Sequence, residues 1–283
     1  MSTIRIAIIV LNYRGEQTLA RCLSSILPGL QKEDALLVVD NGREGLLMRD
    51  ISIRFPEVEV IAAHENLGFS RGMNLGIRHM QEKGNFDAFW LLNTDATILP
   101  DTLEQLKAAL RSNGSRALYS PVIYHDPKKR PWFAGGRIDF FRMRAEHQRV
   151  VFREDAYETG FLTGCALFIP REVIASIGLL DERYFLYYED VEYSLRAFRR
   201  SLKLLVVPTA RAYHSEVSRE NPAKTYWLVR SGAEFFLREA RGWWRAWVRV
   251  YFFLRRLKNW LETIYAPRSL AREVKRAYTD VSL

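Results

Sequence analysis

Cysteine is nearly absent from this chain of 283 residues, which contains only Cys22 and Cys165. A fold held together by disulfides needs several cysteines, so we expect no disulfide framework. We also expect the protein to reside in a reducing compartment. Both thiols are expected to be buried in the core. Glycine and proline, with 16 and 10 residues, are too few for a collagen-like or disordered chain.

Long hydrophobic runs are also absent. No run of about 18 apolar residues free of charge occurs, so we expect no membrane-spanning helix. The apolar stretch of residues 4–10 is short, lacks a basic leader and continues directly into Asn12-Tyr13. It therefore indicates a first β-strand rather than a signal peptide, and we expect a cytoplasmic protein.

Acidic residues are scarce at the C-terminal end. Residues 216–283 contain 14 Lys and Arg against 7 Asp and Glu, while the whole chain has a formal net charge of +9. The basic character therefore belongs mainly to this tail. No nucleic-acid-binding motif accompanies the charge, so we expect no nucleic acid partner.

What the chain has is a large hydrophobic fraction, 48%, arranged in alternating strand and helix signals. Strands are expected at 4–10, 35–39, 58–62 and 88–92, and helices near 16–27, 72–81 and 101–112, the last with a cap region at Pro100-Asp101. This alternation predicts an α/β fold, Rossmann-like, with a mainly parallel sheet and helices on both faces.

The second half of the chain is less regular. Residues 120–150 look irregular and would suit an acceptor- or sugar-binding flap, in which Trp132 either stacks on a sugar or packs in the core. Beyond them we expect a strand before Pro170, helices at 171–177 and 190–199, and a strand at 204–207. We divide the chain into a domain of residues 1–215, with a nucleotide-binding half (1–95) and an acceptor half (96–215), and a helical tail (216–283).

Polar residues follow three of the expected strands: Asn12-Tyr13, Asp40-Asn41-Gly42 and Asn93-Thr94-Asp95. A loop with three glycines, residues 65–76, lies between the last two. An Asp-Asn-Gly sequence alone is more often a turn. Because open α/β sheets bind ligands at the carboxyl ends of their strands, the set together predicts a nucleotide site.

A second acidic cluster, Glu189-Asp190 with Glu192, follows several aromatic residues. Two separated acidic sites indicate two different roles: one site binds a cation and the other transfers a proton. The alternative is that these carboxylates only favour the dipole of a helix that starts there.

In this order the motifs resemble glycosyltransferase family 2, most closely its bacterial rhamnosyltransferase-like members. The resemblance covers about residues 4–215. The matching segments are Val10-Leu11-Asn12-Tyr13, Val39-Asp40-Asn41-Gly42, Asn66-Leu67-Gly68-Phe69, Asn74-Leu75-Gly76, Leu91-Leu92-Asn93-Thr94-Asp95, Thr163-Gly164-Cys165, Gly178-Leu179-Leu180-Asp181-Glu182, Phe185-Leu186-Tyr187-Tyr188-Glu189-Asp190 and Tyr213-His214.

The resemblance implies a GT-A fold and transfer of a sugar, with inversion, from a nucleoside diphosphate. It implies that Asp40 contacts the base and that Asn93 and Asp95 lie at the ribose and at a diphosphate-bound Mg²⁺ or Mn²⁺. Asp190 would be the general base, and His214 a second metal ligand or a diphosphate contact. Further residues expected to contact the donor are Asn12, Tyr13, Asn41, Gly68, Arg71 and Asn74, although Arg71 could equally be a solvated loop charge.

Two departures from the family pattern matter. The first acidic position of the usual metal motif is Asn93 here, which leaves Asp95 as the certain carboxylate. The Gln-x-x-Arg-Trp motif of processive relatives is absent, so we expect one sugar to be added per encounter.

The substrates are less constrained than the reaction class. The best expectation is transfer of L-rhamnose from dTDP-L-rhamnose to a saccharide or polyprenyl-linked acceptor, in the synthesis of a bacterial surface polysaccharide. UDP-hexose or UDP-galactofuranose transfer is the alternative. A nonenzymatic, membrane-associated nucleotide-binding scaffold is a second alternative, and a nucleotidylyltransferase is disfavoured because its Gly-rich loop is missing after Val10.

The tail shows helical periodicity in its apolar residues. These are Trp243, Trp247, Val250, Tyr251, Leu254, Leu257, Leu261, Ile264 and Tyr265, with Arg and Lys between them. A cationic amphipathic helix with tryptophans is typical of a segment on an anionic membrane, here the inner face of the cell membrane. Packing on its own domain, or pairing in a homodimer, would give the same pattern.

Overall fold

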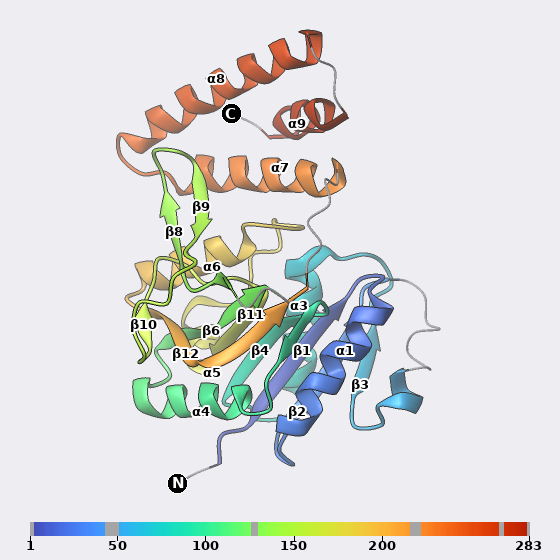
Figure 1. Cartoon of the computed structure of the whole chain (residues 1–283). Coiled ribbons are helices and arrows are strands. Elements are labelled where there is room, and N and C mark those ends of the chain that lie inside the picture. The colour runs from blue at the N-terminus through green and yellow to red at the C-terminus, as the bar shows by residue number, and fades with distance from the viewer. Residues whose placement is uncertain (1–2, 43–50, 126–129, 216–221, 266–268, 282–283) are drawn as a thin grey trace.

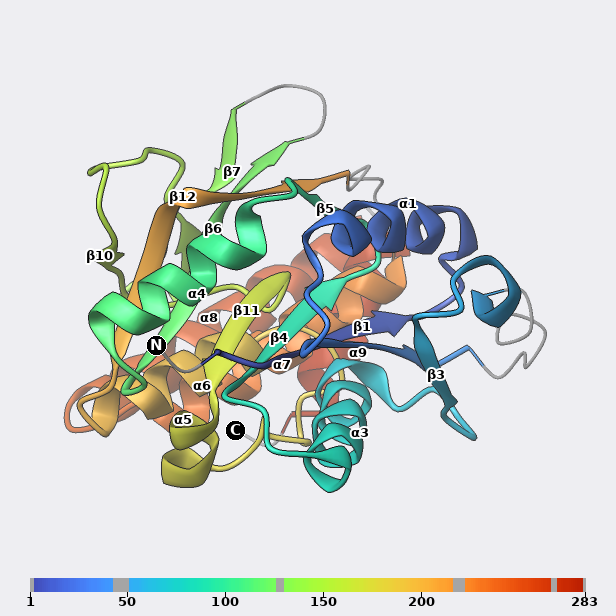
Figure 2. The same ribbon diagram turned by 90° about the horizontal axis from the view of Figure 1, so that it is seen from below.

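The computed structural model describes residues 3–42, 51–125, 130–215, 222–265 and 269–281. Within these ranges a ten-stranded sheet runs through the molecule, with helices on both faces, and β8 and β9 form a separate hairpin (Figures 1 and 2). The strands are β1 (Ile6–Asn12), β2 (Ala35–Asp40), β3 (Glu59–Ala62), β4 (Ala88–Asn93), β5 (Ala96–Ile98), β6 (Ala117–His125), β7 (Pro131–Phe133), β8 (Gly136–Asp139), β9 (Arg144–His147), β10 (Tyr157–Glu158), β11 (Ala166–Pro170) and β12 (Lys203–His214).

The sheet confirms the predicted α/β fold. Its main order is β10-β12-β6-β11-β4-β1-β2-β3, in which β3, β2, β1 and β4 are parallel and β11 runs antiparallel between β4 and β6. The four strands expected in the first half of the chain are all present within two residues of their expected ends. Their carboxyl ends lie at one edge of the sheet.

Helices cover both faces of the sheet and one edge. They are α1 (Glu16–Ile26), α3 (Gly68–Lys83), α4 (Thr102–Asn113), α5 (Arg171–Ile177), α6 (Glu189–Arg199), α7 (Pro222–Glu239), α8 (Trp244–Tyr265) and α9 (Ser269–Thr279), with a short 3₁₀ turn at Leu27–Gly29. In Figure 2, α1 and α4 lie on one face and α3, α5 and α6 on the other. In Figure 1, α7, α8 and α9 stack above the edge at which the central strands end.

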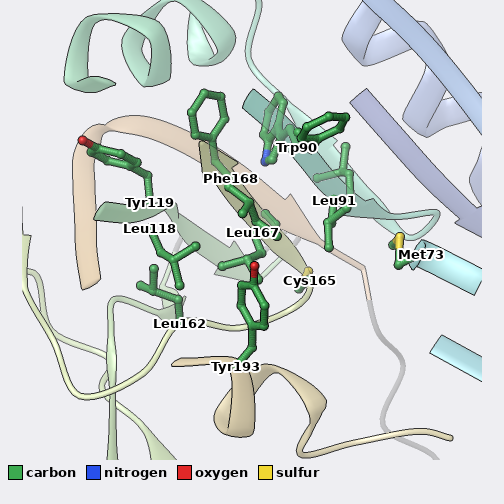
Figure 3. Close-up of a cluster of buried hydrophobic side chains, with 14 of the residues drawn as sticks. Met73, Trp90, Leu91, Leu118, Tyr119, Leu162, Cys165, Leu167, Phe168 and Tyr193 are labelled. Atoms are coloured by element: carbon green, nitrogen blue, oxygen red, sulfur yellow. The ribbon is translucent and has the colours of Figure 1, made fainter. Parts of the chain in front are cut away.

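The centre of the core lies where β4, β11 and β6 meet (Figure 3). Phe168 of β11 pairs in register with Trp90 of β4 and with Tyr119 of β6. All three rings are buried, and those of Tyr119 and Phe168 pack edge to face at 6.0 Å. This packing fixes the carboxyl end of β4, the place from which Asn93 and Asp95 emerge.

Residues 120–150 are more regular than expected. They contain the end of β6, then β7 and the hairpin of β8 and β9. Their strands are short and interrupted by prolines and glycines, so no apolar run marked them. The strand expected at 204–207 instead runs to His214, because a bulge between Val207 and Arg211 accommodates Pro208.

The cap of α4 also differs in detail from the expectation. Asp101 occupies the N-cap position, but its side chain makes no capping hydrogen bond. The side chain that bonds to the backbone at this turn is that of Thr102, whose hydroxyl oxygen accepts a hydrogen bond from the Leu99 N–H at 3.0 Å.

The basic tail forms α7, α8 and α9. In α8, Val248, Phe252 and Asn259 are buried. Trp247 stacks on Phe141, in the turn between β8 and β9, at a ring distance of 5.2 Å. The side chain of Tyr265 lies outside the described part of the structure. Among the described residues, no helix combines the length and hydropathy that crossing a bilayer requires.

Candidate active site

Asp95 and His214 meet at the end of β4 because of how β5 and β12 pair. The chain turns after Asn93, and β5 then runs antiparallel to the end of β12, with Ala96 opposite His214. This register brings Nε2 of His214 to 3.1 Å from Oδ1 of Asp95. The Ser215 N–H, which donates to the carbonyl of Asp95 at 3.0 Å, holds the turn closed.

His214 is buried, Asp95 is partly buried, and the pair is charged. Burial alone would raise the pKa of the Asp95 carboxyl, but the His214 ring more than offsets this and holds the pKa below its usual value. Burial likewise opposes protonation of His214, and the neighbouring Cys165 and Asp95 side chains overcome that effect and raise its pKa to about 11. The pair is therefore an electrostatic unit.

The donor set of this pair suits a divalent cation. Nε2 of His214 and Oδ1 of Asp95 lie 3.1 Å apart and face each other, so both atoms can share an ion once the imidazole gives up its proton. Two neighbouring ligands of an octahedral ion at about 2.1 Å lie about 3 Å apart, close to the separation seen here. A carboxylate with an imidazole suits Mn²⁺. No cluster of three or more His, Cys, Asp or Glu able to hold a metal occurs in the described ranges, so the remaining ligands would come from substrate phosphate and water.

Asp190 lies in the first turn of α6. Its carboxylate accepts hydrogen bonds from the backbone N–H groups of Gly164 and Val191, both at 2.8 Å. Burial raises the pKa of Asp190, and these N–H groups counteract only part of that effect. A positioned carboxylate with a raised pKa is suited to accept a proton.

The two residues before Glu189 and Asp190 have strained backbones. Tyr187 and Tyr188 both lie in the left-handed region, with φ of 68° and 67°. Such conformations cost about 1–3 kcal/mol each in residues other than glycine and occur most often at functional sites. The ring of Tyr188 packs against Phe235 and Phe236 of α7, so the helices of the tail help to hold this strained turn.

Glu189 was not among the residues predicted for the site. It is 5% exposed, and its Oε2 has no hydrogen-bond partner in the described part of the chain. Burial, followed by the nearby charge of Asp190, raises its pKa well above the usual value. The sequence signal was its place directly before Asp190, although the sequence could not distinguish a buried carboxyl from a first-turn surface charge.

A cavity of about 370 Å³ joins these groups. It is lined by Asn93, Asp95, Asp190 and His214 from the predicted site, and also by Glu189 and Thr163. Two further lining residues, Lys224 and Leu228, come from α7, beyond residue 215. Lys224 was missed because nothing in the sequence distinguishes it from the other basic residues of the tail.

Trp132 lies between two histidines in this cavity. Its ring is 4.5 Å from that of His147 and 4.6 Å from that of His214. The segment of residues 120–150 therefore contributes a wall to the cavity, with Trp132 from β7 and His147 from β9. The ring of Trp132 is half-buried and lines the cavity rather than filling the core.

Asn12, Asp40 and Asn41 lie at neighbouring strand ends outside the lining of this cavity. Asn12 pairs in register with Asp40, and the Asn41 N–H donates to the carbonyl of Asn12 at 2.8 Å. Oδ1 of Asp40 accepts from the Gly42 N–H at 3.1 Å. The amide of Asn41 binds the Leu67 N–H and the Gly68 carbonyl, so it shapes the glycine-containing loop.

The remaining predicted donor residues are dispersed. Tyr13 is half exposed, and Arg71 is exposed with Glu65 at 3.6 Å. Gly68 begins α3 with φ of 73° and contacts Phe185. The buried amide of Asn74 exchanges hydrogen bonds with the backbone of Leu180, and it therefore connects α3 to the segment of residues 180–182.

The fold that carries this site is of the GT-A class, as comparisons with solved structures show. GalNAc-T7, solved with UDP, GalNAc and Mn²⁺, superposes with a TM-score of 0.68 and 17% identity, over 98% of this chain and 54% of the other.

The family follows from the sequence comparisons. The model for glycosyl transferase family 2 matches residues 6–178, and the chain belongs to this family. It is 23% identical over 268 residues to an N-acetylglucosaminyl-diphospho-decaprenol L-rhamnosyltransferase of Mycobacterium tuberculosis, covering 86% of this chain and 87% of the relative. It is 21% identical over 220 residues to the dTDP-rhamnosyl transferase RfbF of Shigella flexneri, covering 74% and 73%. The chain is a glycosyltransferase similar to bacterial rhamnosyltransferases.

Proposed function

We propose that the protein transfers L-rhamnose, with inversion and with the help of a divalent cation, from dTDP-L-rhamnose to a hydroxyl of a lipid-linked saccharide. The observation that carries this proposal is the placement of Asp190 and of the Asp95–His214 pair around one cavity. The two rhamnosyltransferases among its relatives support the donor, and the decaprenyl diphosphate substrate named for one of them supports the acceptor.

Asp95 and His214 would hold Mn²⁺ or Mg²⁺ at the donor diphosphate. When bound, the ion neutralises charge on the departing diphosphate. Lys224 lines the same part of the cavity, close enough to Asp95 to lower its pKa, and adds a second positive charge. Lys224 would thereby also stabilise a dTDP leaving group.

Asp190 accepts the proton of the acceptor hydroxyl. The hydroxyl oxygen attacks the anomeric carbon from the side opposite the diphosphate, so one C–O bond forms as the other breaks. A single displacement needs one base and inverts the configuration. The N–H groups of Gly164 and Val191 keep the carboxylate oriented before and after it takes up the proton.

The donor nucleotide would lie across the strand ends, with Asp40 at the base and Asn12 and Asn93 towards the ribose. Asn41 and Gly68 shape the loop beside it, while Tyr13 and Arg71 are exposed at the rim. Asn74 would act indirectly, because its amide is engaged in joining α3 to the turn of residues 180–182.

Nucleotide binding tests the donor half of the proposal. We expect dTDP and dTDP-L-rhamnose to stabilise the protein more than UDP, GDP or CDP do, and Mn²⁺ to enhance the effect, measured by thermal shift and calorimetry. The variant Asp95→Asn should weaken Mn²⁺-dependent binding by at least about tenfold, since it removes the anionic ligand. The matched control Asp101→Asn, at an exposed position, should bind normally.

Two outcomes would redirect the proposal. A selective response to UDP with turnover of a UDP-sugar would favour the hexose or galactofuranose donor. If the folded protein bound no nucleotide, the scaffold alternative would replace the transferase. Unchanged Mn²⁺ dependence in Asp95→Asn would move the metal site elsewhere.

A further inference from the structure

The outward face of α8 carries large apolar side chains that stay about half exposed in the described part of the chain. They recur every three or four residues and are between 41% and 63% exposed. We call this set the outer stripe: Val250, Phe253, Leu254, Leu257, Trp260, Leu261 and Ile264. In Figure 1, α8 forms the outermost layer, farther from the sheet than α7.

The rest of α8 already has its packing partners. Val248 and Phe252 are buried, Phe252 lies 6.1 Å from the ring of Tyr278, and Asn259 donates to the Ala271 carbonyl at 3.1 Å. The outer stripe is therefore a second apolar surface, pointing away from the domain. Soluble monomers rarely expose contiguous apolar patches of more than a few hundred Å², and such patches usually bind a partner.

An arginine-rich groove borders the outer stripe. It has a volume of about 450 Å³ and lies between α7, α8 and the end of the chain. Its charged lining residues are four arginines and two carboxylates: Arg230, Arg238, Arg245, Arg249, Glu234 and Asp280. Arg238 is paired with Glu234, whereas Arg249 makes no hydrogen bond or ion pair with a described residue and lies one turn before Phe253.

We propose that α8 docks the enzyme on an anionic membrane surface. The outer stripe enters the boundary between headgroups and acyl chains, and the arginine-rich groove receives lipid phosphates. A helix with an apolar face, a basic border and an interfacial tryptophan binds in this way, lying in the plane of the interface. The exposed Trp243, just before α8, extends the same surface.

Charge decides between a membrane and a second copy of the chain. One border of the outer stripe is basic, with Arg245 and Arg249, whereas on the other border Lys258 is paired with Glu262 at 3.6 Å. Antiparallel pairing of two outer stripes would bring the two arginine borders together and repel, whereas anionic lipids complement them. The inference rests on this surface alone and not on the proposed donor or acceptor.

Vesicle co-sedimentation tests the proposal. We expect the purified full chain to bind phosphatidylglycerol vesicles at low salt, to bind phosphatidylcholine vesicles much less, and to be released as salt increases. The double variant Phe253→Ser/Leu257→Ser should lose at least tenfold in partitioning. The matched control is Phe198→Ser, which changes a 66% exposed phenylalanine on α6 and should change partitioning less than twofold.

A charge variant tests the arginine-rich groove separately. Arg249→Gln should lower partitioning onto phosphatidylglycerol by about fivefold at low salt, the contribution of one basic residue near a charged surface. Arg171→Gln, at an exposed position on α5, is the matched control. Equal binding to both lipids, with no effect of Arg249→Gln, would overturn the role of the groove.

Two results would overturn the docking surface itself. One is the absence of vesicle binding by folded protein, as judged by an intact thermal transition. The other is a dimer, seen by light scattering, that the double variant dissociates while vesicle binding is absent or unchanged. Nucleotide-induced stabilisation should be the same in all these variants, which separates this test from that of the donor site.

Discussion

At the scale of single residues, the proposed chemistry depends most on the carboxylate of Asp190. In Asp190→Asn the amide oxygen can still accept the Val191 N–H, but the amide NH₂ faces the Gly164 N–H and leaves it unpaired, at a cost of about 1–3 kcal/mol. The variant should still fold, but no group remains to take the acceptor proton. We expect kcat to fall by about 10²–10⁴-fold while the Kd for the nucleotide changes less than twofold. Asp101→Asn is the control, and near-normal turnover by Asp190→Asn would refute the assignment.

Glu189 gives a residue-scale prediction about stability. Because burial raises its pKa, folding favours the protonated form, and its stabilising contribution is complete below the pKa of the unfolded chain. That contribution is lost as the pH rises through the folded-state pKa, since a charge must then be buried.

Glu189→Gln removes this titration while keeping the shape of the side chain. The melting temperature of the variant should therefore match that of the wild type at acidic pH and exceed it at alkaline pH. Each 1 kcal/mol gained corresponds to about 2–4 °C. A difference in melting temperature that does not vary with pH would show that Glu189 is already ionised or solvated in the folded protein.

At the scale of elements, the start of α3 and the turn before Asp190 fit together through Gly68. A Cβ added at Gly68 would lie 2.3 Å from the carbonyl oxygen of Phe185, which also accepts the Phe69 N–H at 2.7 Å. Gly114 has a similar positive φ, 82°, but no atom within 4 Å of its added Cβ. Comparing substitutions at the two glycines therefore separates the free-energy cost of backbone strain from that of a close contact.

We expect Gly114→Ala to cost about 1 kcal/mol, the strain of a left-handed residue with a side chain. Gly68→Ala should lower the free energy of unfolding by about 2 kcal/mol more and also reduce kcat, because Phe185 must move and carries the strained Tyr187 with it. Chemical denaturation and turnover assays measure both effects. Equal losses in the two variants would mean that the contact with Phe185 is not tight.

The elements differ in how well the sequence predicts them, for physical reasons. The central strands β1, β2 and β4 were predictable because each is a continuous apolar run buried on both faces. The short β7, β8 and β9 carry no such run and depend on pairing with distant residues. Asp95 and Asp190 were predictable as strand-end and helix-start carboxylates, but the contact of Asp95 with His214 depends on the register of β5 and β12, which composition does not encode.

At the scale of the whole molecule, the enzyme is layered: the sheet with its helices, then α7, then α8 with α9 (Figure 1). Periodicity predicted that α8 is amphipathic, but it could not say which way its apolar face points, since an inward and an outward stripe have the same spacing. The structure places Trp247 against its own domain, while Val250, Leu254, Leu257 and others of the periodic set face outward. α7 connects the layers, lining the cavity with Lys224 and packing on Tyr188 with Phe235 and Phe236.

This layering leads to a prediction about catalysis at a surface. If α8 docks on lipid, the enzyme and the lipid-linked acceptor are both confined to the membrane surface. The effective concentration of the acceptor at the enzyme then rises. The variant Phe253→Ser/Leu257→Ser should then transfer sugar to a polyprenyl-diphosphate-linked acceptor in phosphatidylglycerol vesicles at least about tenfold more slowly than the wild type. Transfer to a short-chain, water-soluble analogue of the same acceptor should be unchanged, because the cavity is intact. Equal losses with both acceptors would assign the outer stripe a structural role, and no loss with either would separate membrane docking from turnover.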